Sequence, residues 1–197
     1  MRITALLVTA MLLAPAVRAQ TAPPSREQQL ARWNAHHGDF DYLLGDWAFT
    51  SRSKQYGLGR GFWSARLLDV SGAVLDEYRV TGDSGETYYA SYTLRAYNAA
   101  ADEWELVTVD SGTGLRNIGT GHLVNGEMHI EQTFAATSPA PERWRIRYYD
   151  IRPDRFSWAA DRSTDGGRTW TANFLTIEAR RIGPPREFAP LARPREP

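Results

Sequence analysis

The stretch 115–135 reads LRNIGTGHLVNGEMHIEQTFA, and it decides the fold class. Asn125-Gly126 between two runs of alternating apolar residues is the strongest short-range signal for a two-residue turn joining antiparallel strands. The stretch therefore predicts a hairpin with strands over 115–124 and 127–135.

The same pattern continues on both sides of this hairpin. Runs rich in Val, Ile, Tyr, Trp and Thr alternate with turn residues about every ten positions. No long stretch of helical period separates them, so βαβ units are not expected. A meander of this length avoids exposed edges best by closing on itself, so we expect an all-β, antiparallel up-and-down barrel of about ten strands, with a two-sheet sandwich as the alternative. The predicted strands are 46–53, 60–69, 74–81, 86–98, 103–110, 115–124, 127–135, 142–152, 155–162 and 169–180.

A second tight turn is predicted at Ser71-Gly72, between the second and third strands. A two-residue turn here pairs Val70 with Ala73 and places Trp63 opposite Val80. One face of this hairpin is then charged and the other apolar, as expected for a wall with solvent on one side.

Composition narrows the classes of function. The chain has 197 residues, a formal net charge of zero and no cysteine. Zero net charge gives no support for nucleic acid as a partner, because phosphate binding needs a basic surplus. The lack of cysteine removes disulfides, thiolate metal sites and a cysteine nucleophile.

The two ends of the chain differ from this middle section. Arg2, the short apolar run 3–13 and the small residues before Gln20 are typical of a secretory signal peptide. We therefore expect a periplasmic or secreted protein with no membrane span after signal cleavage. The predicted segments are a signal peptide over 1–19, an N-terminal lead with a short helix (27–37) over 20–37, the barrel over 38–182 and a Pro-rich tail over 183–197.

The stretch Phe40-Asp41-Tyr42-Leu43-Leu44-Gly45-Asp46-Trp47 stands just before the first predicted strand. Its Gly45-x-Trp47 resembles the Gly-x-Trp signature of lipocalins. In that group a short helical turn closes the barrel bottom, and an Arg from the last strand packs across the Trp ring. The resemblance implies this role for Arg180 or Arg181.

The string Ser163-Thr164-Asp165-Gly166-Gly167-Arg168-Thr169-Trp170 lies near the other end of the middle section. Together the two strings resemble a family of largely uncharacterised bacterial secreted domains with a lipocalin-like (calycin-type) β-barrel, which implies a fold rather than an activity. The second string also resembles the Asp-box of sialidases, a hairpin turn in which the Asp bonds loop amides. We expect Asp165 to shape the last turn and to have no catalytic role.

Aromatic residues, 12% of the chain, are candidates for the walls of an interior site or for core filling. Arg143, Arg145 and Arg147 alternate with apolar residues along one strand. Three guanidinium groups on one face suit a carboxylate in a cavity, or a solvated face paired with acids. The candidate ligand-binding residues are Trp63, Tyr78, Tyr88, Tyr92, Arg145, Arg147, Trp158 and Phe174.

The Asn125-Gly126 turn also brings together the candidate catalytic residues His122, His129 and Glu131. Two imidazoles and a carboxylate in cross-strand positions suit a divalent metal or an acid–base pair. The alternative is a polar outer face opposite the apolar inner one. The clean separation of polar from apolar residues favours this outer face, so we predict no metal and no cofactor.

Three hypotheses for the function remain. The leading one is an exported lipocalin-like barrel that binds a small, mostly apolar or aromatic molecule in its interior. The alternatives are a barrel-cavity enzyme using acid–base chemistry (an isomerase, cyclase or hydratase) and a structural envelope domain without a ligand. A filled barrel without a cavity would favour the structural domain, a cavity lined only by aromatics and Arg would favour binding, and a cavity containing the His pair would favour the enzyme.

Overall fold

The computed structural model of the protein describes residues 22–68, 72–110 and 114–187. The signal peptide predicted over 1–19 and the last ten residues of the predicted tail lie outside these residues. No helix in the described part of the chain is both long and apolar enough to cross a membrane.

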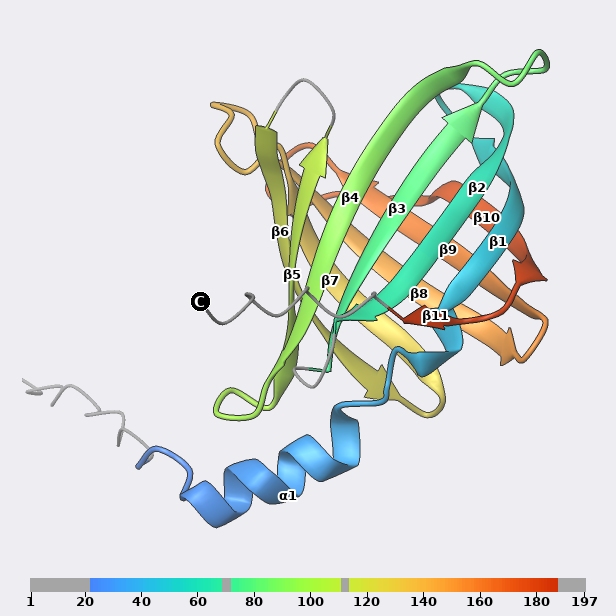
Figure 1. Ribbon diagram of the computed structural model, residues 1–197. Coiled ribbons are helices and arrows are strands. Elements are labelled where there is room, and N and C mark those ends of the chain that lie inside the picture. The colour runs from blue at the N-terminus through green and yellow to red at the C-terminus, as the bar shows by residue number, and fades with distance from the viewer. Residues whose placement is uncertain (1–21, 69–71, 111–113, 188–197) are drawn as a thin grey trace, which may run out of the picture.

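Ten antiparallel strands form a closed barrel (Figure 1). Each strand pairs with the next along the chain, and β1 also pairs with β10, which closes the sheet. The expected up-and-down barrel is therefore confirmed, and the ten predicted strands match those observed to within a few residues. The strands are β1 (Gly45–Ser53), β2 (Gly57–Leu68), β3 (Ala73–Thr81), β4 (Thr87–Asn98), β5 (Glu103–Asp110), β6 (Gly114–Val124), β7 (Glu127–Phe134), β8 (Glu142–Arg152), β9 (Arg155–Ser163) and β10 (Thr171–Gly183).

The C-terminal boundary of the barrel differs slightly from the prediction. The last barrel strand continues to Gly183, and a two-residue strand, β11 (Arg186–Glu187), pairs in parallel with β2 next to the start of β1. Gly183 and residues 186–187 therefore belong to the sheet, whereas the prediction assigned them to the tail.

The predicted helix is present as α1 (Arg26–His36), which lies across one end of the barrel (Figure 1). Ser25 begins it with a capping box, in which its hydroxyl accepts from the Gln28 N–H and the Gln28 side chain accepts from the Ser25 N–H. Arg32 fastens the helix to the β4–β5 turn by donating to the carbonyls of Ala99 and Ala100. We call this the closed end, and the opposite one the far end.

A short 3₁₀ helix, η1 (Asp41–Leu43), leads from α1 into β1 and closes the barrel floor. Trp47 is fully buried there, with the Arg181 guanidinium 4.1 Å from its ring centre, so the packing implied by the Gly-x-Trp resemblance is present. Gly45 has φ of +110°, and a Cβ there would lie 2.5 Å from Arg181 Nη1. The glycine therefore leaves space for the arginine that covers the tryptophan.

The β6–β7 hairpin has the predicted register. His122 pairs with His129, Leu123 with Met128, and the turn residues have positive φ, 53° at Asn125 and 81° at Gly126. This conformation is the one that matches strand twist in a two-residue hairpin.

The predicted register of the β2–β3 hairpin is wrong by two residues. Leu68 pairs with Ala73, and Trp63 lies opposite Tyr78 instead of Val80. The shift is even, so every side chain keeps its predicted face. A Cβ on Gly72 would lie 2.8 Å from the Trp33 ring, so α1 packs directly against this turn. Such a contact from a distant segment cannot be deduced from the turn residues alone.

Candidate ligand-binding site in the barrel interior

A buried ion pair occupies the barrel interior. Asp76 on β3 and Arg95 on β4 have relative exposures of 1% and 3%, and their side chains are in direct contact. The Trp63 indole donates to Asp76 Oδ1 at 2.7 Å, and Arg95 Nη2 donates to the Tyr148 hydroxyl at 3.2 Å. Burying two charges is costly unless they are paired and hydrogen-bonded, so these partners keep the pair tolerable in the core.

Three further donors near this pair lack a hydrogen-bond partner among the described residues. They are Arg95 Nε, Trp104 Nε1 and the Tyr42 hydroxyl, and all three atoms are buried. The rings of Trp104 and Tyr42 pack against Phe40 with centroid separations of 4.9 and 6.1 Å, and the Arg95 guanidinium lies 5.1 Å from the same ring centre. Buried polar groups in native proteins are nearly always satisfied, so these three donors are candidate contacts for water or a bound molecule.

A second polar region lies on the inner wall of β4–β7, nearer the far end. Thr93 and Thr108 face each other with hydroxyls 3.1 Å apart, and Gln132 Nε2 donates to Thr108 Oγ1 at 3.1 Å. Asn117 accepts from the Ala135 N–H through Oδ1, while its buried Nδ2 has no partner in the described chain. We call these four side chains the polar wall.

The facing side of the interior is aromatic. Phe49 stacks on Tyr78 with ring centres 4.9 Å apart, and Trp158 meets the Tyr148 ring edge-on. Phe174 belongs to a group of rings nearer the far end. The interior is therefore amphipathic, with hydrogen-bonding groups on one side and aromatic faces on the other.

Half of the predicted ligand-binding residues do lie inside the barrel. Trp63, Trp158 and Phe174 are buried, and Tyr78 is partly buried and packs against the buried hydrophobic core. Burial also raises the pKa of the Tyr78 hydroxyl, which keeps this phenol protonated.

The other half do not line the interior, and the prediction is wrong for them. Tyr88 is 70% exposed and donates to Glu86, and Tyr92 is 41% exposed on the outer face of β4. Arg145 and Arg147 point outward and stack on aromatic rings, 4.1 and 4.5 Å from the ring centres. The cause is strand alternation, because buried apolar side chains of β8 take the inward positions between the arginines.

The candidate catalytic residues also lie on the outer face. His122 and His129 are about half exposed and lie 3.7 and 3.3 Å from the carboxylates of Glu103 and Glu127. Glu131 is paired with Arg143 and does not approach the interior. No group of three or more His, Asp or Glu side chains in the described residues is placed to hold a metal ion. The geometry that the barrel-cavity enzyme required for these residues is absent.

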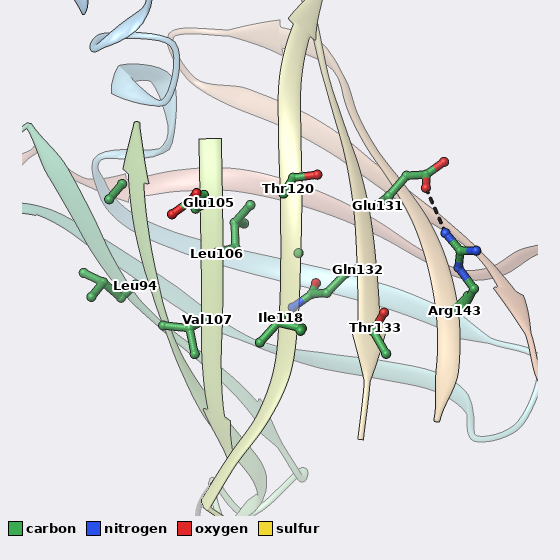
Figure 2. A pocket seen from close by; sticks show the side chains of 12 residues that line it. Leu94, Glu105, Leu106, Val107, Ile118, Thr120, Glu131, Gln132, Thr133 and Arg143 are labelled. Carbon is green, nitrogen blue, oxygen red and sulfur yellow. Dashed lines mark hydrogen bonds and ion pairs between the residues drawn. The ribbon is translucent and has the colours of Figure 1, made fainter. Parts of the chain in front are cut away.

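A shallow groove of about 610 Å³ crosses the outer face of β4–β8. Figure 2 shows Leu94, Val107 and Ile118 on adjacent strands, with the Glu131–Arg143 ion pair at one side. A smaller hollow of about 420 Å³ contains His122 and His129. Of the charged side chains that border these hollows, Glu131 is paired with Arg143 and Arg145, and Glu105 accepts from Asn98, whereas the unpartnered polar groups are buried inside the barrel. The interior is therefore the better candidate site.

The last hairpin is built as predicted from its sequence. Asp165 Oδ1 accepts from the N–H groups of Arg168 and Thr169 at 2.9 and 3.0 Å, and Oδ2 accepts from the Thr169 hydroxyl at 2.7 Å. These bonds from Thr169, together with one from the Ser163 hydroxyl, hold the pKa of Asp165 well below its usual range. Its carboxylate is thus occupied in shaping the turn.

The polar wall and the buried ion pair were not predicted. Along β4, the outward residues Tyr92 and Leu94 are more apolar than the inward residues Thr93 and Arg95. Reading the strand by hydrophobicity alone selects the wrong face. The inward face of β4 follows instead from its pairing with β5, because the buried Trp104 lies opposite Tyr97 and strand alternation then places Arg95 and Thr93 inside.

The closed strand pairing, the closing turn and the Trp47–Arg181 stack define the class of protein as a lipocalin-like antiparallel β-barrel. No protein-family model matches the chain, and no curated protein matches it. Among solved structures, it is similar to the S-type phycobiliprotein lyase CPES from Guillardia theta, with a TM-score of 0.47 and 10% identity over 75% of this chain and 91% of that one. It is also similar to EF1p2_mFAP2b bound to DFHBI, with a TM-score of 0.38 and 15% identity over 74% of this chain and 98% of that one.

Proposed function

We propose that the protein is an exported barrel that binds a small molecule in its interior. The apolar or aromatic part of the molecule packs against the aromatic side, and its polar groups meet the polar wall and the closed end. Export rests on the signal peptide expected over residues 1–19.

The observation that carries this proposal is the set of buried hydrogen-bond donors in the barrel interior that have no partner in the described chain. A barrel that served only as a scaffold would be most stable with an apolar core, because each unsatisfied buried donor costs about 1–3 kcal/mol. Here Arg95 Nε, Trp104 Nε1, Tyr42 Oη and Asn117 Nδ2 are all buried without a partner in the described chain. A bound molecule that supplies these partners would offset that cost.

The test uses a fluorescent probe with an apolar ring and one carbonyl, 6-propionyl-2-(dimethylamino)naphthalene. Its emission moves to shorter wavelength when it leaves water, so titration against the full chain gives stoichiometry and affinity. We expect saturable binding of one molecule per chain. The absence of saturable binding would contradict the proposal.

A matched pair of variants locates the bound probe. Trp104→Phe removes a buried indole N–H that has no partner in the described chain, while Trp170→Phe removes an indole N–H at the last hairpin that donates to the Gly167 carbonyl. We expect Trp104→Phe to weaken binding about 3- to 10-fold, the equivalent of one hydrogen bond, and Trp170→Phe to leave it unchanged. The reverse pattern would place the probe outside the barrel.

A further inference from the structure

The free hydrogen-bonding groups at the closed end are donors. Arg95 Nε and Trp104 Nε1 can only donate, and neither has a partner in the described residues. Burial is the largest of the influences that raise the pKa of the Tyr42 hydroxyl well above its usual range, so this phenol keeps its proton and is a donor as well. A ligand group that satisfies these three atoms must therefore present an acceptor.

The charge at this end is already balanced. Arg95 is always protonated, and its positive charge is matched by Asp76, which also accepts from Trp63. A ligand carboxylate would bring a second negative charge into a region whose fully buried arginine is already paired. Arg181, the other guanidinium at the barrel floor, covers Trp47 and donates to three backbone carbonyls, so its N–H groups are already engaged. The charge of the ligand would be desolvated without a counter-ion of its own, which makes binding of an anion unfavourable.

The side chains that carry the three donors all pack against Phe40. Tyr42 and Tyr148 approach with ring centres 5.9 Å apart, and Arg95 donates to the Tyr148 hydroxyl. The rings of Trp104 and Tyr148 both meet Phe40 at nearly right angles. These packed rings give the closed end apolar surfaces for the part of a ligand that carries the acceptor.

We propose that the closed end recognises an uncharged acceptor oxygen of the ligand, such as a ketone or amide carbonyl, and discriminates against a carboxylate. This inference rests on the proposed function and adds the chemical class of the ligand's polar end. It differs from the arginine-to-carboxylate recognition suggested by the sequence, because Asp76 already neutralises the interior arginine.

Two probes that share one ring system test the charge preference. They are 6-propionyl-2-(dimethylamino)naphthalene, which ends in a ketone, and 6-(dimethylamino)naphthalene-2-carboxylate, which ends in an anion. We expect the ketone to bind at least about tenfold more tightly, a difference of roughly 1.4 kcal/mol. Equal or tighter binding of the carboxylate overturns this inference and leaves the proposed function standing, whereas failure of both probes to bind contradicts the proposed function itself.

Two tyrosine variants test the donors themselves. Tyr42→Phe deletes a hydroxyl without a partner, whereas Tyr97→Phe deletes one that donates to Asp102 at 2.6 Å. We expect Tyr42→Phe to weaken ketone binding at least about fivefold without lowering the melting temperature of the ligand-free protein. Tyr97→Phe should lower the melting temperature and leave ketone binding unchanged. Unchanged ketone affinity in Tyr42→Phe would overturn the assignment.

Discussion

Replacing Trp47 with alanine should remove the support of the barrel floor. The indole is fully buried, its N–H donates to the Leu43 carbonyl at 2.8 Å, and its ring meets Phe156 edge-on with centres 4.8 Å apart. The Arg181 guanidinium that covers it also donates to the carbonyl of Leu44 and two others. Truncating a buried tryptophan to alanine costs about 3–5 kcal/mol, and the loss of support for the arginine places this site in the upper half of that range.

The assay is urea unfolding followed by far-ultraviolet circular dichroism, which does not depend on the deleted indole. For a chain of this size, a loss of about 3–5 kcal/mol corresponds to a fall in melting temperature of about 6–20 °C. Trp170→Ala is the control, because that ring is only half-buried at the last hairpin and should cost about 1 kcal/mol or less. If Trp47→Ala unfolded within about 1 kcal/mol of the wild type, the closing role of this residue would be refuted.

Four other outcomes follow from the same geometry. Arg95→Met should destabilise the fold by about 3–5 kcal/mol, because it leaves Asp76 buried and unpaired, whereas the double variant with Asp76→Leu should recover most of that loss in urea titrations. Folding lowers the pKa of Asp165, so the carboxylate contributes its full stabilisation above about pH 4 and loses it as the pH falls. Asp165→Ala should therefore lower the melting temperature at neutral pH and make the melting temperature fall less steeply with decreasing pH below about pH 4. His129→Ala should change stability by less than about 0.5 kcal/mol, since the side chain is exposed, and a larger loss would indicate a structural role. The exported protein should begin at Gln20, and an intact mass that retains the first 19 residues would contradict the signal-peptide assignment.

Local features of the fold were predictable because the residues that determine them are adjacent in the chain. The Asn125-Gly126 turn alone sets the β6–β7 register, and Asp165 bonds atoms within four residues of itself. The Trp47–Arg181 stack was predictable only through the resemblance to lipocalins, since its two residues come from opposite ends of the domain.

The interior site was largely unpredictable from the sequence, for a physical reason. Large aromatic residues were expected to face inward, yet Tyr92 lies outside while Thr93 and Arg95 lie inside. Arg95 is tolerated there only because Asp76, 19 positions earlier in the sequence, meets it across the β3–β4 pair. That compensation depends on the strand register, which no local pattern in either strand specifies.

The most direct test of interior binding is a two-dimensional nitrogen–proton NMR spectrum of the protein with ¹⁵N-labelled tryptophan, recorded during titration with the naphthyl ketone. Trp63 and Trp104 have buried indoles inside the barrel, whereas Trp33 on α1 and Trp170 at the last hairpin lie outside the buried core. We expect shifts of the Trp63 and Trp104 indole resonances, with the Trp104 N–H moving as it gains an acceptor, and little change at Trp33 and Trp170. Shifts confined to Trp170, or no shift at any indole, would contradict the claim that the ligand binds inside.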